Sequence, residues 1–126
     1  LFIKNRKNFY FYYKRYIKDL SKNISLPSYK SFKNASYHLF LININFESIK
    51  SSKDRLFEYL NKKNIFPQFH YKPLYMFSFY KKNKANFSGA KKYYSNTLSL
   101  PLFYKIKKKE QNYIIKHLRY FLNKKN

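Results

Sequence analysis

The sequence predicts a small α+β domain in which a short antiparallel sheet carries helices packed on it. Two patterns lead to this fold class. Apolar residues recur at every second position between 40 and 46, which is typical of a strand with one buried face. Apolar residues also recur at helical spacing near both ends of the chain. The 126 residues are enough for one domain with a modest core, and no linker divides them.

The first 35 residues are predicted to form a helix and then a loop. Residues 1–20 carry one apolar stripe at helical spacing, made of Phe2, Phe9, Tyr13, Tyr16, Ile17 and Leu20. The aromatic residues at 9–16 are expected to enter the core partly, although their mixture with basic residues would also suit stacking on single-stranded bases. Residues 21–35 contain Pro27 and several serines without periodicity, which indicates a loop.

Two strands are predicted in the middle of the chain. The first lies at 39–45, and His38 falls on the same face as Phe40 and Ile42, which favours a histidine in the core. The second lies at 65–71 and contains Pro67, which suits an edge strand because proline cannot donate a backbone hydrogen bond. We expect both strands in one antiparallel sheet.

A helix is predicted between these strands, at 53–63. Ser51 and Ser52 can cap its first turn, with Asp54 placed to answer Ser51. Lys53 falls on its polar face. Beyond Pro73, residues 74–80 suit a short helical turn, 90–96 a helix and 98–102 an extended piece. The chain ends in a helix with an apolar stripe, and this helix and the 53–63 helix are expected on one face of the sheet.

The composition excludes several classes of function. The chain has no cysteine and only one glycine, so thiolate metal sites and glycine-rich phosphate loops are impossible, and the histidine spacing matches no zinc pattern. No apolar run approaches the roughly 20 residues of a membrane helix. The net charge of +23 suits a polyanion, but enrichment in Lys, Asn, Ile, Phe and Tyr together is what an AT-rich genome produces.

The candidate binding residues are aromatic and imidazole side chains. His70 and Tyr71 end a predicted strand, and strand ends often line sites. Tyr37 and His38 are a weaker pair at the start of the other strand. The alternative for all four is structural support of the strand pair. His117, in the terminal helix, is expected at the surface.

Three motifs carry a resemblance to a known family. They are Ser36-Tyr37-His38-Leu39-Phe40, then Gln68-Phe69-His70-Tyr71-Lys72-Pro73-Leu74, and then the run 87–102 that reads FSGAKKYYSNTLSLPL. Segments 55–65 and 110–115 agree in order and spacing as well. Together they resemble the DegT/DnrJ/EryC1/StrS aminotransferases over nearly the whole chain. The runs at 46–50 and 70–73 look most like the branch that makes the 4-amino precursor of pseudaminic acid.

This resemblance implies a fold-type-I enzyme that uses pyridoxal phosphate (PLP). Its large domain comes first in sequence and carries the PLP lysine, so that domain and any catalytic residue would lie outside this chain. Residues 1–35 would lead into the small C-terminal domain at 36–126. The parent would be a cytoplasmic homodimer that moves an amino group, usually from glutamate, to a keto group on a nucleotide-sugar for cell-surface glycans. His70, Tyr71, Tyr37 and His38 would line the cleft for the nucleotide-sugar.

Two other functions stay open at this level. The chain could be a basic module that binds nucleic acid without enzymatic activity, or a decayed fragment. The start at Leu1, without Met, indicates a piece of a longer protein. Departures from the family pattern concern turns: the family prefers Gly near Asn64, Pro at Ser88, Glu at Lys91, and a Pro-Gly turn near 104–105. Such losses put the loop geometry in doubt because Gly and Pro suit special backbone angles.

Overall fold

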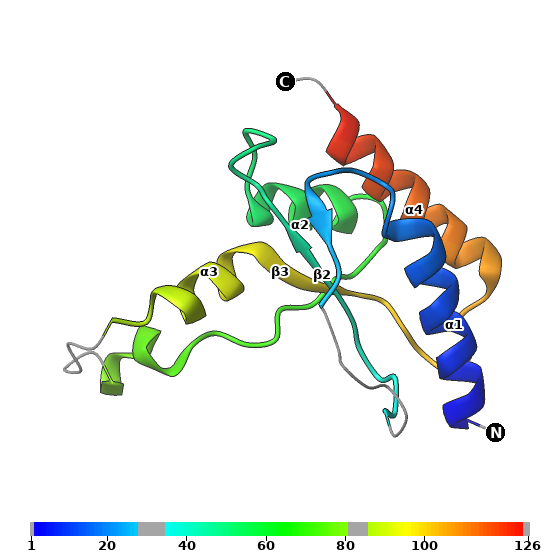
Figure 1. Cartoon of the computed structure of the whole chain (residues 1–126), viewed down its shortest axis with the longest axis horizontal. Coiled ribbons are helices and arrows are strands. Elements are labelled where there is room, and N and C mark those ends of the chain that lie inside the picture. Colours follow the sequence, from blue (N-terminus) through cyan, green and yellow to red (C-terminus); the bar gives the residue numbers. More distant parts are fainter. Residues whose placement is uncertain (1, 28–34, 81–85, 125–126) are drawn as a thin grey trace.

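The computed structural model describes residues 2–27, 35–80 and 86–124, and Figure 1 shows a body of helices around a sheet with one long extension. The elements are α1 (Phe2–Ile17), β1 (Ile24–Ser25), β2 (Phe40–Ile44), α2 (Lys53–Asn61), the 3-10 turns η1 (Leu74–Met76) and η2 (Ser78–Tyr80), α3 (Ser88–Asn96), β3 (Thr97–Leu100) and α4 (Lys108–Asn123). The predicted α+β class is confirmed. No helix in these described ranges is long and apolar enough to cross a membrane.

The sheet is antiparallel, with the order β1-β2-β3. In the central strand β2, Phe40, Ile42 and Ile44 are fully buried while the residues between them are partly exposed, as the alternation predicts. β1 was not expected, because two residues are too short to show a period. On its other edge β2 pairs with β3, with Ile42 opposite Leu98.

The helix α1 packs its aromatic side chains into the core. The rings of Tyr10 and Tyr13 lie 4.9 Å and 5.0 Å from that of Phe40, and the Tyr13 hydroxyl donates to the Pro101 carbonyl at 3.0 Å. Burial raises the pKa of Tyr13 above its ordinary value, so this hydroxyl remains a donor. The expectation that these aromatics enter the core is confirmed.

The helix α4 contacts both α1 and α2. Its apolar stripe is buried in the same core as the face of β2, and consists of Ile114, Ile115, Leu118 and Leu122. The side-chain amide of Gln111, also buried, donates to the Phe9 carbonyl at 2.9 Å. Leu56 and Leu60 of α2 lie in the same core. Both helices therefore pack with the sheet, as expected.

The helix α2 differs from the prediction at its first turn. Ser52, not Ser51, is the cap, because its hydroxyl accepts from the Arg55 N–H at 3.2 Å. Lys53 is buried, with 8% of its surface exposed, instead of lying on a solvated face. Beyond the helix, Asn64 has φ of 56°, in the left-handed region. The family's glycine preference near this position thus has a backbone reason, and Asn is among the residues that tolerate it.

The predicted strand at 65–71 is wrong. Only Gln68 forms a bridge, with Ser99 of β3, and the rest of the segment has no strand pairing. Strand-like composition at 65–71 reflects side-chain packing and does not by itself supply pairing beyond Gln68, whose N–H and carbonyl both face Ser99. The third strand is β3, within the piece expected at 98–102.

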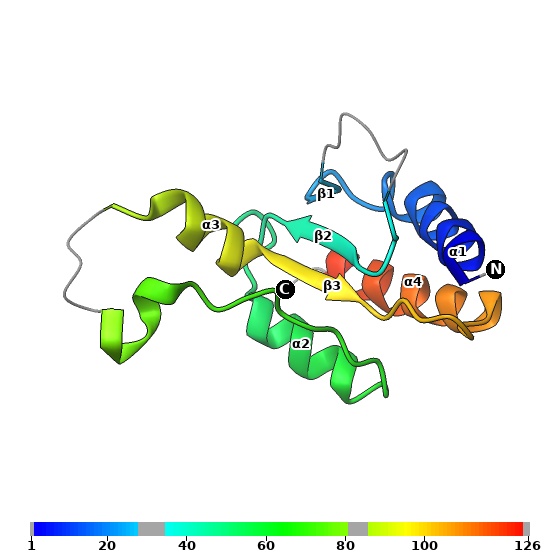
Figure 2. The ribbon, with the colours of Figure 1, turned by 90° about the horizontal axis from the view of Figure 1, so that it is seen from below.

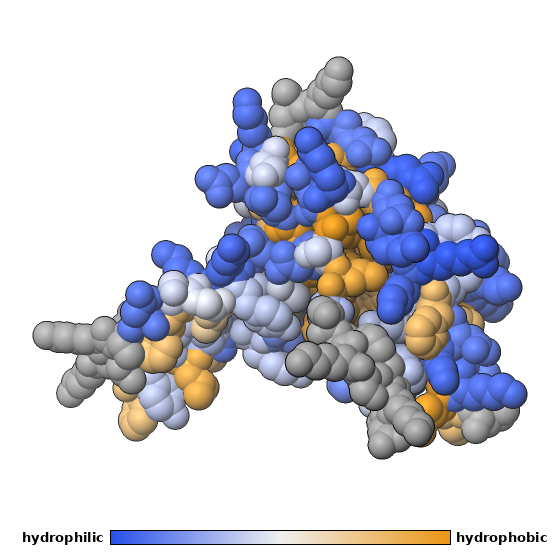
Figure 3. All heavy atoms as spheres, viewed as in Figure 1, coloured by the Kyte–Doolittle hydropathy of each residue, from blue (hydrophilic) through white to orange (hydrophobic). Residues whose placement is uncertain are grey.

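Residues 71–80 and 86–96, which we call the arm, extend away from the body (Figures 1 and 2). The arm contains η1, η2 and α3. The helical turn expected at 74–80 and the helix expected at 90–96 are therefore confirmed. The rings of Tyr75 and Phe87 stack at 4.8 Å and 7°, which joins its two segments. Apolar side chains gather on it at the left of Figure 3.

Candidate functional site

The candidate site centres on the bridge between Gln68 and Ser99. The Ser99 N–H donates to the Gln68 carbonyl at 2.8 Å, and the Gln68 N–H donates back at 3.1 Å. On the other edge of β3, Ser99 lies opposite Leu41 of β2. Ser99 is only 4% exposed. Because the strand is paired on both sides, the position of the Ser99 hydroxyl is fixed.

The His70 ring is held by this hydroxyl. Its Nε2 lies 2.8 Å from the Ser99 Oγ, while its Nδ1 is shielded from solvent and has no hydrogen-bond partner among the described residues. Burial lowers the pKa of His70 below its ordinary value, and the nearby His38 lowers it further. The ring is therefore neutral at neutral pH and able to donate through one nitrogen and accept through the other.

Tyr71 lies beside His70 at the base of the arm. Its ring is perpendicular to the imidazole, with centroids 4.9 Å apart and an angle of 89°. With 76% of its surface exposed, Tyr71 is available for contacts outside the chain. These two predicted residues thus stand together where the body meets the arm.

The structure separates the second predicted pair. Tyr37 is 7% exposed, and its ring lies 5.2 Å from that of Tyr10 in the core. His38 is exposed, with Nδ1 3.1 Å from the Ser36 hydroxyl, so the expectation of a core histidine is wrong. The reason is local: Tyr37 has φ of 50°, which breaks the alternation before the strand begins at Phe40.

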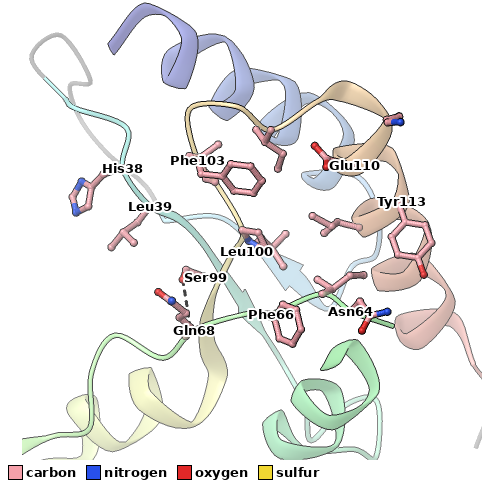
Figure 4. A pocket seen from close by; sticks show the side chains of 16 residues that line it. His38, Leu39, Asn64, Phe66, Gln68, Ser99, Leu100, Phe103, Glu110 and Tyr113 are labelled. Carbon is pink, nitrogen blue, oxygen red and sulfur yellow. Dashed lines mark hydrogen bonds between the residues drawn. The ribbon is translucent and has the colours of Figure 1, made fainter. Parts of the chain in front are cut away.

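A cavity of about 750 Å³ opens beside β3 (Figure 4). His38, Gln68 and Ser99 lie at one end, and Glu110 and Tyr113 lie at the other. The lining between them is mainly apolar. Its size is in the range of small-molecule sites. His70 and Tyr71 are outside its lining, so Ser99 is the residue shared by the cavity and the His70 contact.

The buried lysine of the described residues is not available to PLP. A PLP site needs an available lysine amine, and Lys53, the one buried lysine in the described ranges, is already engaged. Its ammonium group donates to the Tyr94 carbonyl and lies 3.7 Å and 4.2 Å from the ring centroids of Tyr94 and Phe69. Burial lowers the pKa of Lys53, and the charge of Asp54 partly opposes this shift.

Sequence reasoning missed Ser99 and underrated His117. His117, expected at the surface, is half-buried, and its Nδ1 lies 2.8 Å from the Tyr59 hydroxyl. Ser99 belongs to the quoted motif at 87–102, which was the available signal. Its hydrogen bond spans 29 residues, so its partner could not be derived from local pattern.

The fold is that of solved aminotransferases. An aminotransferase from Streptoalloteichus hindustanus matches 96% of this chain with a TM-score of 0.83 and 20% identity, over 32% of its own length. The Helicobacter pylori aminotransferase PseC, of pseudoaminic acid biosynthesis, matches 95% with a TM-score of 0.83 and 24% identity, over 32% of its length. A Streptococcus pneumoniae protein described as a sugar aminotransferase, in its PLP form, matches 96% with a TM-score of 0.78 and 23% identity, over 31% of its length.

The chain belongs to the DegT/DnrJ/EryC1/StrS aminotransferase family, whose model matches residues 1–119. A curated relative is the UDP-4-amino-4,6-dideoxy-N-acetyl-beta-L-altrosamine transaminase of Campylobacter jejuni, 35% identical over 103 residues that make up 79% of this chain. The chain spans 27% of the length of that relative. The resemblance expected from the sequence motifs is confirmed.

Proposed function

We propose that the chain is the C-terminal part of a sugar aminotransferase that transfers an amino group, with glutamate as the donor, to the keto sugar of a nucleotide-sugar. The family match over residues 1–119 and the Campylobacter jejuni relative support this proposal. The observation that carries it is the 35% identity to a transaminase whose name specifies a UDP-linked amino sugar. The product would serve cell-surface glycan biosynthesis in the cytoplasm.

In this proposal the work is divided between two domains. PLP, held by a preceding large domain with its lysine, supplies the chemistry that carries the amino group from donor to acceptor. Residues 36–126 form the small domain, and 1–35 lead into it. The parent is a homodimer.

We place the nucleotide-sugar against His70 and Tyr71. The His70 ring is fixed by Ser99 at 2.8 Å, so its entropy is already reduced before a ligand arrives. Tyr71 is exposed beside it and can stack on or bond to the ligand. His38 lies exposed at the side of the proposed nucleotide-sugar site, and the buried Tyr37 holds the backbone next to His38 in place.

A chimera tests this function. This chain replaces the matching segment of the Campylobacter jejuni transaminase, which is assayed with its own nucleotide-sugar and amino donor. We expect turnover, and His70→Ala should raise KM for the nucleotide-sugar roughly tenfold, the effect of one hydrogen bond, with a smaller effect on kcat. His117→Ala is the matched control and should leave KM unchanged. A folded chimera without turnover would contradict the function. Unchanged KM with a lowered melting temperature in His70→Ala would remove His70 from the cleft.

A further inference from the structure

The Ser99 hydroxyl has one proton and two possible recipients. Its oxygen lies 2.8 Å from His70 Nε2 and 3.4 Å from the Gln68 carbonyl oxygen. The carbonyl can only accept. If the Ser99 proton goes to the carbonyl, the Ser99 oxygen must accept from His70, so the proton of the neutral ring is on Nε2.

The reverse arrangement satisfies fewer groups. If Ser99 donated to Nε2, its contact with the Gln68 carbonyl would no longer be a hydrogen bond. The ring proton would then be on Nδ1, which is buried without a partner among the described residues. A buried donor left unpaired is costly. The first arrangement makes two hydrogen bonds and leaves only a lone pair on Nδ1.

The other two histidines use the opposite nitrogen. His38 bonds to Ser36 through Nδ1 at 3.1 Å, and His117 bonds to Tyr59 through Nδ1 at 2.8 Å. His70 is thus the histidine whose Nδ1 is left over for an added partner. That partner must be a hydrogen-bond donor, because the single proton of the neutral ring is on Nε2 and Nδ1 can only accept.

We propose that Ser99 is a positioning residue that holds the His70 ring with its proton on Nε2, so that Nδ1 accepts a hydrogen bond from a hydroxyl of the sugar. This inference rests on the proposed function, in which His70 contacts the nucleotide-sugar. It assigns His70 the role of acceptor, whereas a histidine contact to a phosphate would require a donor. Specificity then favours a sugar that carries the hydroxyl, because only such a ligand gains this hydrogen bond.

Access to Nδ1 requires a local movement. The Tyr71 ring lies against the His70 ring at 4.9 Å and is 76% exposed, so displacing it sacrifices little buried surface. A small shift of the Tyr71 ring can therefore bring the ligand beside the imidazole while Tyr71 stays in contact with that ligand.

The ring proton is observed directly by NMR of this chain labelled with ¹⁵N-histidine, because a protonated ring nitrogen and a bare one differ strongly in ¹⁵N chemical shift. At pH 7.5 we expect His70 to carry its proton on Nε2. Ser99→Ala should shift the ring towards a mixture of both forms, Ser99→Thr should restore the original form, and Ser36→Ala should change only His38. A proton on Nδ1, or a Ser99→Ala spectrum identical to the original, would overturn the role of Ser99.

Titration with UDP-N-acetylglucosamine and with UDP tests the ligand. The sugar nucleotide should move the His70 Nδ1 resonance upfield, and UDP, which lacks the sugar, should leave it in place. An Nδ1 resonance unmoved by saturating sugar nucleotide overturns the acceptor role. These results also separate the two proposals: a wrong tautomer refutes the inference alone, whereas an unmoved resonance with the expected tautomer refutes the placement of the sugar at His70.

Discussion

The body and the arm of this molecule contain similar apolar residues, but these side chains are buried in the body and exposed in the arm. Phe40 in the body is fully buried, whereas Phe79 in the arm is 85% exposed. Leu118 and Leu74 differ in the same way, at 0% and 66%. Apolar content alone therefore does not identify a core. In the arm the same side chains form an exposed surface of a kind typical of interaction sites, and they contribute little to the stability of this chain.

The largest expected difference comes from one substitution made in both regions. Phe40→Ala should lower the free energy of unfolding by about 3–5 kcal/mol, because it removes a ring from the centre of the core. Phe79→Ala should change it by less than about 0.5 kcal/mol. Urea unfolding of both variants measures these values. A comparable loss at Phe79 would show that the arm has a core of its own.

Lys53 gives a second test of the difference between body and arm, because this residue of the body contacts Tyr94 of the arm. Lys53→Ala should cost about 2 kcal/mol, since it removes contacts with two rings and leaves the Tyr94 carbonyl without its donor. Lys91→Ala, at an exposed position of α3, is the matched control and should be nearly neutral. Equal effects in urea unfolding would mean that the buried lysine is not a structural contact.

The two serines before α2 give a smaller effect within the body. Ser52→Ala should lower the free energy of unfolding by about 1 kcal/mol, because the Arg55 N–H loses its acceptor. Ser51→Ala should stay within about 0.5 kcal/mol. Thermal melting of the two variants decides between them, and a larger loss at Ser51 would favour Ser51 and Asp54, the weaker capping pair expected from the sequence.

The smallest effect is a dependence of stability on pH. The pKa values of His70 and His117 are lowered in the folded chain from 6.5 in each case, mainly by burial. The unfolded state therefore binds protons first as the pH falls below about 6.5, and stability should fall from pH 7 to 5.5. Replacing both residues by Gln should flatten this decline in melting temperature. An unchanged slope would exclude them as its source.

Strong periodicity explains what could be predicted from the sequence. The apolar stripe of α4 and the alternation of β2 determine which faces are buried, so these elements and the fold class follow from local pattern. In α1 the predicted stripe is buried at Tyr13 and Ile17, but Phe2 and Tyr16 are exposed. The pairing partner of each strand does not follow from local pattern. The segment at 65–71 carries β-like composition, yet it pairs only at Gln68, and β3 takes the position beside β2.

The candidate site was predictable only in part. The sequence selects His70 and Tyr71 as the end of a strand that does not form, and their place in a binding site stays a prediction. The separation of Tyr37 from His38 depends on one left-handed residue that no composition rule identifies. The burial of Lys53 depends on rings from two other segments, and the contact of Ser99 with His70 depends on tertiary pairing.

Lys53 also holds the base of the arm against the body. α3 joins the sheet at Thr97, and the Tyr94 carbonyl in its last turn accepts from the ammonium group of α2. Rotation of α3 about this junction would pull that carbonyl and the Tyr94 ring away from the cation and hydrate it. A substitution at position 53 should therefore loosen the arm at its base, near Tyr94, while every residue within the arm stays the same.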